Sequence, residues 1–169
     1  MARLPRRTFT WLDAIALVSA TALGGWWVAS TWYFDSFDSI ADMIPCFPEM
    51  SLPPLTAWTL AVVALRLLPP RPLLRRVVRQ PGAAASGAVA AVFTLANIDG
   101  FGGPIPDISP EQSAIAVAIV WGLLRAGRAC RPEPSWIDRL GRAIGLSWIL
   151  LDLRFVYEYA HLQWITSGG

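Results

Sequence analysis

The chain alternates between long apolar stretches and short polar connections. The apolar stretches cover about residues 12–33, 54–68, 82–98, 110–124 and 143–164. A helix needs roughly 20 residues to cross a hydrocarbon layer of about 30 Å, and the longest stretches reach that length. The pattern therefore predicts an all-α polytopic membrane protein. We expect a bundle of five transmembrane helices that forms one membrane domain over residues 1–169.

Local signals predict where several of these helices begin and end. Pro53 and Pro54 stand where we expect the second helix to start, and prolines 69–70 would stop it. The residues Ser-Pro-Glu-Gln at 109–112 match a capping box with proline at the first helical position. These signals give the second helix only about 15 residues.

The last helix is predicted to be unusually long. It starts at Ser135 and extends to about Trp164, some 30 residues or roughly 45 Å. Its first turns, residues 136–142, are amphipathic and basic, so we expect them to lie along the cytoplasmic surface. Gly141 and Gly145 then predict a bend before the chain enters the bilayer.

The charged residues of the connections alternate in sign along the chain. The sequence has no lysine, and its arginines gather in three connections: Arg3, Arg6 and Arg7; Arg66, Arg71, Arg75, Arg76 and Arg79; Arg125, Arg128, Arg131, Arg139 and Arg142. The acidic residues gather in the two connections between them: Asp35, Asp38, Asp42 and Glu49; Asp99, Asp107 and Glu111. Positive residues stay on the cytoplasmic side of a membrane. The alternation predicts a cytoplasmic N-terminus, five crossings and an external C-terminus in the inner (plasma) membrane of a bacterium.

A four-span alternative, with the second or fourth segment re-entrant, would put an arginine-rich connection outside. Composition supports membrane insertion, because 54% of the residues are hydrophobic and 15% are charged, against about 25% charged in soluble domains. Several tryptophans lie where apolar stretches begin or end: Trp11, Trp32, Trp136 and Trp164. Nucleic-acid binding would account for arginines but not for their alternation with apolar spans.

The two cysteines fall on opposite sides of the membrane in this topology. Cys46 lies in the first external connection and Cys130 in the last cytoplasmic one, so they cannot form a disulfide with each other. We expect both to be unpaired, and the alternative is that Cys46 pairs with another chain in an oxidising compartment.

Small residues predict where helices approach one another closely. Ala83, Gly87 and Ala91 are spaced by four and share one face of the third helix. Gly24 and Gly25 would allow another close approach in the first helix. We expect these residues to serve helix packing and the third helix to be central in the bundle.

The last helix carries four polar residues at predicted membrane depth: Asp152, Arg154, Glu158 and His161. Asp152 follows Arg142 by ten residues, about 15 Å, which places it near the bilayer midplane. Arg154, Glu158 and His161 share one stripe and Asp152 points nearly the opposite way, so Arg154 and Glu158 should pair. Ionisable residues at this depth mark either a functional site or a structural pair. The cluster is expected to dock a partner, with an ion or proton path as the alternative.

A second ion pair is predicted at the inner rim. Asp13 in the first helix and Arg66 in the second lie at the same level, and we expect their pair to be structural.

The motifs of known cofactor and catalytic sites do not appear in the sequence. A single histidine excludes bis-histidine haem ligation within the chain, so we expect no cofactor and no metal. Two alternatives remain: His161 as a single axial ligand of haem or a pigment, and a divalent cation at the external acids Asp35, Asp38 and Asp42.

Three functions are compatible with these features, in order of preference. The first is a non-catalytic accessory, structural or assembly subunit that binds the lipid bilayer and other membrane-protein subunits, or itself. The second is a small transporter or channel that uses the polar face of the last helix. The third is an intramembrane enzyme with Asp152 or Glu158 as its acid–base group, which would need a second catalytic group at the same depth.

Overall fold

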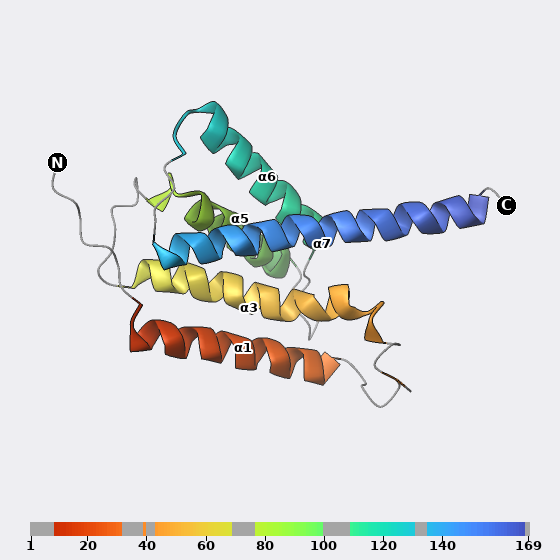
Figure 1. The fold of residues 1–169 in the computed structure, drawn as a ribbon, viewed down its shortest axis with the longest axis horizontal. Coiled ribbons are helices and arrows are strands. Elements are labelled where there is room, and N and C mark those ends of the chain that lie inside the picture. The colour runs from red at the N-terminus through yellow and green to blue at the C-terminus, as the bar shows by residue number, and fades with distance from the viewer. Residues whose placement is uncertain are drawn as a thin grey trace.

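Five long helices make up the described part of the protein. A computed structural model describes residues 9–31, 39, 43–68, 77–99, 109–130 and 135–167, and these residues contain helices and no strand. The helices are α1 (Trp11–Thr31), α3 (Phe47–Leu67), α5 (Pro81–Asp99), α6 (Pro110–Ala126) and α7 (Trp136–Ser167) (Figure 1). The all-α prediction is confirmed.

Three of these helices are long and apolar enough to cross a membrane: α1, α3 and α5. Helix α6 has 17 residues and α7 has 32, and neither is among the three. The expectation of a membrane protein is therefore supported by α1, α3 and α5, while the crossings of α6 and α7 stay predictions.

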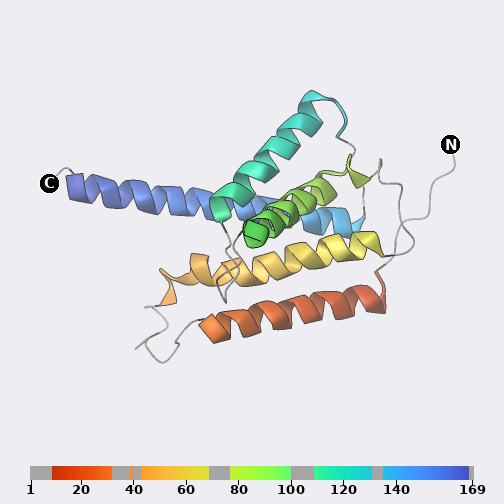
Figure 2. The ribbon, with the colours of Figure 1, turned by 180° about the vertical axis from the view of Figure 1, so that it is seen from behind.

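The helices lie side by side in an order that differs from the chain order. Helix α1 packs on α3, α3 packs on α7, and α5 contacts α3, α6 and α7 (Figures 1 and 2). Their shared core contains Val62 and Leu65 of α3, Ala85 and Val89 of α5, and Trp148 of α7. Helix α5 has three neighbours, as α3 and α7 also do, so the predicted third helix shares the central position with these two.

Tryptophan N–H groups join the helices at three of these contacts. Trp58 Nε1 of α3 donates to Thr21 Oγ1 of α1 (3.0 Å), and Trp148 Nε1 of α7 donates to Thr59 Oγ1 of α3 (3.2 Å). Trp121 Nε1 of α6 donates to the carbonyl oxygen of Pro81 at the start of α5 (2.8 Å). Trp148 is fully buried, so its N–H needs a partner inside the protein. Together the three bonds join α1 to α3, α3 to α7, and α6 to α5.

Helix α3 begins seven residues before the predicted start at residue 54. It starts at Phe47 with Pro48 in its first turn, and Pro53 and Pro54 lie inside the helix. The prediction was wrong because it took this proline pair as the helix start. Pro48 already occupies that position, where a missing N–H costs nothing. The helix therefore has 21 residues, as α1 does.

Helix α7 is continuous, and the predicted bend at Gly141 and Gly145 is wrong (Figure 1). Both glycines are buried where α7 crosses its neighbours. A methyl group on Gly141 would lie 2.5 Å from the carbonyl oxygen of Gly82 in α5. One on Gly145 would lie 3.0 Å from the Cβ of Ala85. These glycines allow close helix packing, the role that small residues four apart play in membranes.

The predicted packing residues divide into two groups. Gly24 lies at a close contact, since a methyl group there would be 2.5 Å from the Cα of Pro54, and Ala83 is buried. Gly25 and Gly87 face open space, and Ala91 is exposed. The expected stripe in α5 was wrong beyond Ala83, because the buried face of that helix passes instead through Gly82, Ala85, Ser86 and Val89.

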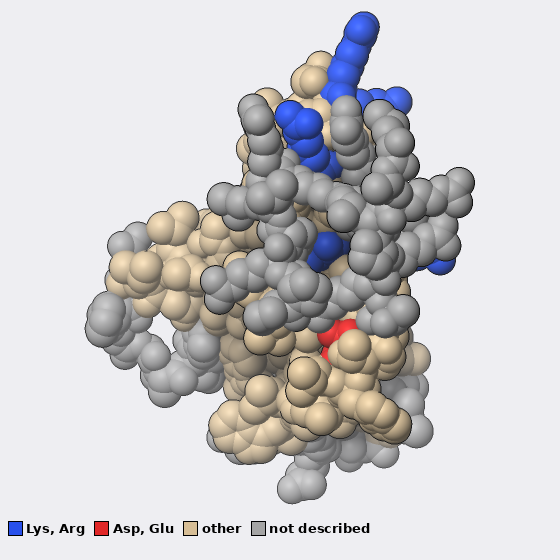
Figure 3. All heavy atoms as spheres, turned by 90° about the vertical axis from the view of Figure 1, so that its left-hand side faces the viewer, with Lys and Arg blue, Asp and Glu red and all other residues tan. Residues whose placement is uncertain are grey.

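The arginines of the described residues gather at one end of the bundle. Arg66 ends α3, Arg79 precedes α5, Arg125 and Arg128 end α6, and Arg139 and Arg142 lie in the first turns of α7. Figure 3 faces this end and shows several arginine side chains with acidic atoms at one place. We call it the basic end. Arg154 lies towards the opposite end, where Glu49 and Glu111 begin their helices.

Other predicted features lie outside the described residues. They comprise Trp32, the possible cation ligands Asp35, Asp38 and Asp42, and the remaining charged residues Arg3, Arg6, Arg7, Arg71, Arg75, Arg76, Asp107 and Arg131.

Candidate functional site

Asp138 is a fully buried carboxylate that joins three helices at the basic end. Its Oδ1 accepts a hydrogen bond from the backbone N–H of Gly82 (2.9 Å), one of the first N–H groups of α5. Its Oδ2 lies 3.3 Å from Arg142 Nε one turn along α7, and its Oδ1 lies 3.9 Å from Arg66 Nη2 of α3. A carboxylate at a helix N-terminus satisfies an N–H that has no partner within the helix. Asp138 therefore holds α3, α5 and α7 together.

Asp13 is also buried and forms a capping box at the start of α1. Its Oδ2 accepts from the backbone N–H of Thr10 (2.9 Å), and its own N–H donates to Thr10 Oγ1 (3.3 Å). This reciprocal pattern supports the first turn of the helix. The predicted Asp13–Arg66 pair stays a prediction, and it suits the register that the Trp58–Thr21 bond gives α1 and α3.

Arg154 and Glu158 form an ion pair on α7, as their spacing of four residues predicts. The guanidinium is about half exposed, and the carboxylate about a third. His161 is exposed one turn further on, where its ring stacks on that of Tyr157 at 6.1 Å between centroids. Both contacts join residues of α7 only, so neither brings a side chain from another helix to Arg154, Glu158 or His161.

Asp152 lies on a different side of α7 from the ion pair. Its side chain is partly exposed, and its carboxylate is close enough to Glu111, in the first turn of α6, for their charges to repel. Four of the predicted site residues therefore divide into a pair, a separate carboxylate and an exposed histidine. The structure does not bring them together.

A count of ten residues from Arg142 predicts Asp152 near the middle of the span. The continuous helix keeps that separation, about 15 Å. In the structure α7 already lies between its neighbours at Asp138, which contacts Arg66 and Gly82. Trp148 is fully buried in the core shared with α3 and α5, and Asp152 lies one turn beyond it along α7. The depth of Asp152 in the bilayer stays a prediction.

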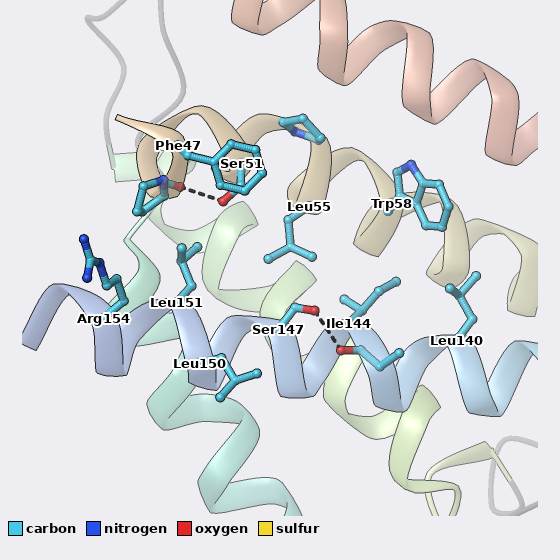
Figure 4. Close-up of a pocket in the computed structure, with 13 residues that line it drawn as sticks. Phe47, Ser51, Leu55, Trp58, Leu140, Ile144, Ser147, Leu150, Leu151 and Arg154 are labelled. Atoms are coloured by element: carbon cyan, nitrogen blue, oxygen red, sulfur yellow. Dashed lines mark hydrogen bonds between the residues drawn. The ribbon is translucent and has the colours of Figure 1, made fainter. Parts of the chain in front are cut away.

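An apolar groove of about 600 Å³ runs between α3 and α7 (Figure 4). It extends from Leu140 and Trp58 to Arg154 and Phe47, so Arg154 lies at one end of it. The two serine hydroxyls in its wall bond to their own helices: Ser51 Oγ donates to Pro48 O (2.6 Å), and Ser147 Oγ donates to Ala143 O (3.0 Å). The groove therefore presents carbon surface along its length and one cation at its end.

One face of α7 is apolar and exposed along nearly the whole helix. We call this face the α7 seam; it consists of Ala143, Leu146, Leu150, Leu153, Tyr157, Ala160 and Trp164. The spacing alternates between four and three residues, the heptad pattern by which one helix packs along another. At 100° per residue the seam lies opposite Trp148, which faces the bundle.

The outer part of α7 extends past the other helices. Phe47, the first residue of α3, lines the groove close to Arg154, so residues 155–167 continue beyond that helix for about 20 Å. Figures 1 and 2 show this segment standing clear of the bundle. Apolar side chains such as Val156, Leu162 and Ile165 are more than half exposed on it.

The described residues contain no cluster of three or more His, Cys, Asp or Glu that would suit a metal ion. Cys46 precedes α3 and Cys130 follows α6, and both are free thiols at opposite ends of the bundle. Their separation agrees with the prediction that they do not pair with each other.

Sequence reasoning missed the role of Asp138 and the contact between α5 and α7. The pattern around Asp138 indicates a helix start, and Arg142 four residues later also signals an ion pair. Gly141 and Gly145 form a Gly-x-x-x-Gly motif, which signals close helix packing rather than a bend. The α7 seam could also have been found from its heptad spacing.

No family model, no curated protein and no solved structure matches the chain. The function is therefore inferred from the geometry of its own residues.

Proposed function

We propose that this protein is a non-catalytic multi-pass membrane protein that serves as an accessory or assembly subunit of a larger membrane complex. It binds a helix of another subunit along the α7 seam. We place it in the inner membrane of a bacterium with the basic end in the cytoplasm, because arginines stay on that side. The outer part of α7 then points away from the cytoplasm.

The exposed seam is the observation that supports this proposal best. A helix partner requires an apolar side chain every three to four residues along one face, and the seam supplies such a face. The seam keeps that spacing from Ala143 to Trp164 and contains Tyr157 and Trp164, residue types that dominate binding energy at interfaces. The seam also continues along residues 155–167, which extend past the other helices (Figure 1).

The charged groups of the described site support a structural role. Asp138 joins three helices, Asp13 caps α1, and Arg154 is paired with Glu158. These contacts explain why buried or half-buried charges are present without any chemical step.

The transport alternative has less support from the geometry. A path for ions needs polar groups that follow one another along a common passage. Asp152 is repelled by the charge of Glu111 in α6, whereas Arg154, the partner of Glu158, lines the groove on the side of α7 towards α3. A second cavity, of about 330 Å³, lies between α3, α5 and α6. Neither this cavity nor the groove is lined by Asp152, Glu158 or His161.

The experiment is affinity purification of the tagged protein at native abundance in a mild detergent. Mass spectrometry then identifies and quantifies the proteins that accompany it. We expect one or a few membrane subunits with the wild type, and at least a tenfold loss of them when Leu153, Tyr157 and Trp164 are replaced by alanine. The matched control replaces Phe155 and Leu162, on the opposite side of the same segment, and should retain the partner. A wild-type protein that runs alone as a monomer, or equal retention by both variants, would refute the proposal.

A further inference from the structure

We propose that the groove between α3 and α7 binds the acyl chain of an anionic phospholipid whose headgroup is held by Arg154. The groove shares Ala143 and Leu150 with the α7 seam, but its other lining residues on α7 and all of those on α3 lie outside the seam. Lipid binding in the groove is therefore tested separately from the proposed function. Three properties of the groove support lipid binding there.

The first property is the chemical character of the wall. Leu55, Ile144 and Leu151 supply aliphatic surface along its length, and Trp58 adds an aromatic ring (Figure 4). The hydroxyl hydrogens of the two wall serines are already donated to backbone carbonyls. A ligand in the groove is therefore stabilised by burying apolar surface, and few polar groups in the wall are available to bind it.

The second property is the length of the groove along α7. Its lining residues on α7 extend from Arg154 to Leu140, fourteen residues or about 21 Å along the helix. One leaflet of a bilayer is about 15 Å deep, half of a hydrocarbon core of roughly 30 Å. The groove is therefore long enough to hold an acyl chain whose headgroup lies at Arg154. The volume of about 600 Å³ is within the range of small-ligand sites.

The third property is the charge at the outer end. Among the described residues, Arg154 is the one charged side chain that lines the groove, and it lies beside Phe47 and Pro48 at the N-terminus of α3 (Figure 4). Helix N-termini favour anions, so both features attract a phosphate. The ion pair with Glu158 uses Nη2 of Arg154, and a guanidinium has five N–H donors in all. Glu49 in the first turn of α3 is exposed and does not line the groove.

Binding can be measured by native mass spectrometry of the delipidated full chain in detergent. The probes are dioleoyl phosphatidylglycerol and dioleoyl phosphatidylcholine, which have the same chains and differ in headgroup charge. We expect one lipid adduct on the wild type, with about fivefold tighter binding of phosphatidylglycerol. Arg154→Gln should remove that preference while the adduct itself persists.

A groove-filling variant separates this site from general lipid binding. Ser147→Phe puts a ring into the groove and should abolish the adduct of both lipids. Leu146→Phe adds a ring at the neighbouring position, which does not line the groove, and should leave binding unchanged. The proposal is overturned if the adduct survives in Ser147→Phe, or if Arg154→Gln keeps the headgroup preference. It is also overturned if a photoreactive residue at position 147 crosslinks in native membranes to a polypeptide rather than to lipid.

Discussion

Charged side chains in this protein differ sharply in how far they are buried. Asp138 and Asp13 are fully buried and accept backbone hydrogen bonds at the starts of α5 and α1. Asp152 and Glu158 are partly exposed and lie towards the other end of α7. A buried carboxylate with several partners is costly to lose, because its partners are left without a counter-charge. An exposed carboxylate is solvated by water, so its ion pairs contribute little to the free energy of unfolding.

Replacing Asp138 should therefore destabilise the bundle strongly. We expect Asp138→Ala to cost about 3–5 kcal/mol, since Arg66 and the N–H of Gly82 both lose this partner. Asp138→Asn keeps an acceptor for Gly82 but loses the charge, and should fall between the alanine variant and the wild type. Thermal unfolding of the purified proteins in one detergent measures the difference.

Asp152→Ala is the matched control for this comparison. It also removes an aspartate carboxylate from α7, but at a partly exposed position. We expect it to change the free energy of unfolding by no more than about 0.5 kcal/mol. Equal effects of Asp138→Ala and Asp152→Ala would show that Asp138 does not join the helices.

At the scale of the elements, some glycines allow two helices to pack closely and others have no close neighbour. Gly141 contacts the backbone of Gly82 where α7 crosses α5, whereas a methyl group on Gly87 of α5 would have no neighbouring atom within 4 Å. A methyl group added at Gly141 therefore tests helix packing, whereas one added at Gly87 tests only helix propensity.

Gly141→Ala should destabilise the protein by about 1–3 kcal/mol, because the new methyl group would be only 2.5 Å from the Gly82 carbonyl oxygen. Gly87→Ala should instead stabilise it by roughly 0.5–1 kcal/mol, since alanine favours a helix more than glycine does. The thermal midpoints of the two variants in the same detergent should move in opposite directions. A neutral Gly141→Ala would contradict the tight α5–α7 contact.

The sequence predicts the helices well and their contacts poorly, for physical reasons. Apolar length determines where a helix forms, so α1, α5 and α6 lie within two residues of their expected bounds. The start of α3 was missed because Pro53 and Pro54 resemble a helix start, yet the chain tolerates them inside the helix. The sequence pattern is compatible with a helix that starts at Pro48 or at the Pro53–Pro54 pair, and the structure shows that it starts at the earlier proline.

The site was predicted less well because its contacts depend on the whole bundle. Asp138 contacts Arg66 of α3 and Gly82 of α5, which are 72 and 56 positions away in the chain, so the local sequence of α7 does not indicate them. The Arg154–Glu158 pair was predictable because both residues lie on one helix, four residues apart.

At the scale of the whole molecule, the two ends of the bundle differ in charge. The described arginines other than Arg154 gather at the basic end, and Glu49 and Glu111 begin helices at the other. Three helices have the length and apolarity to cross a membrane. The proposed topology therefore puts Cys46 outside and Cys130 in the cytoplasm.

The two native cysteines allow a direct test of this topology. In intact spheroplasts a membrane-impermeant maleimide should label Cys46 and leave Cys130 unlabelled, and Cys130 should react only after permeabilisation. The single variants Cys46→Ser and Cys130→Ser assign each signal. Labelling of Cys130 before permeabilisation would place the basic end outside and reject the orientation.

The claim that α7 binds another subunit is tested most directly by site-specific photocrosslinking in native membranes. A photoreactive amino acid is placed at Leu153 or Tyr157 on the α7 seam, or at Phe155 or Tyr159 on the opposite side of the helix. The proposed function predicts a crosslink to a different membrane polypeptide from the two seam positions, and little or none from the other two. Crosslinks of equal yield from all four positions, crosslinks to a second copy of this chain alone, or no crosslinked product would contradict it.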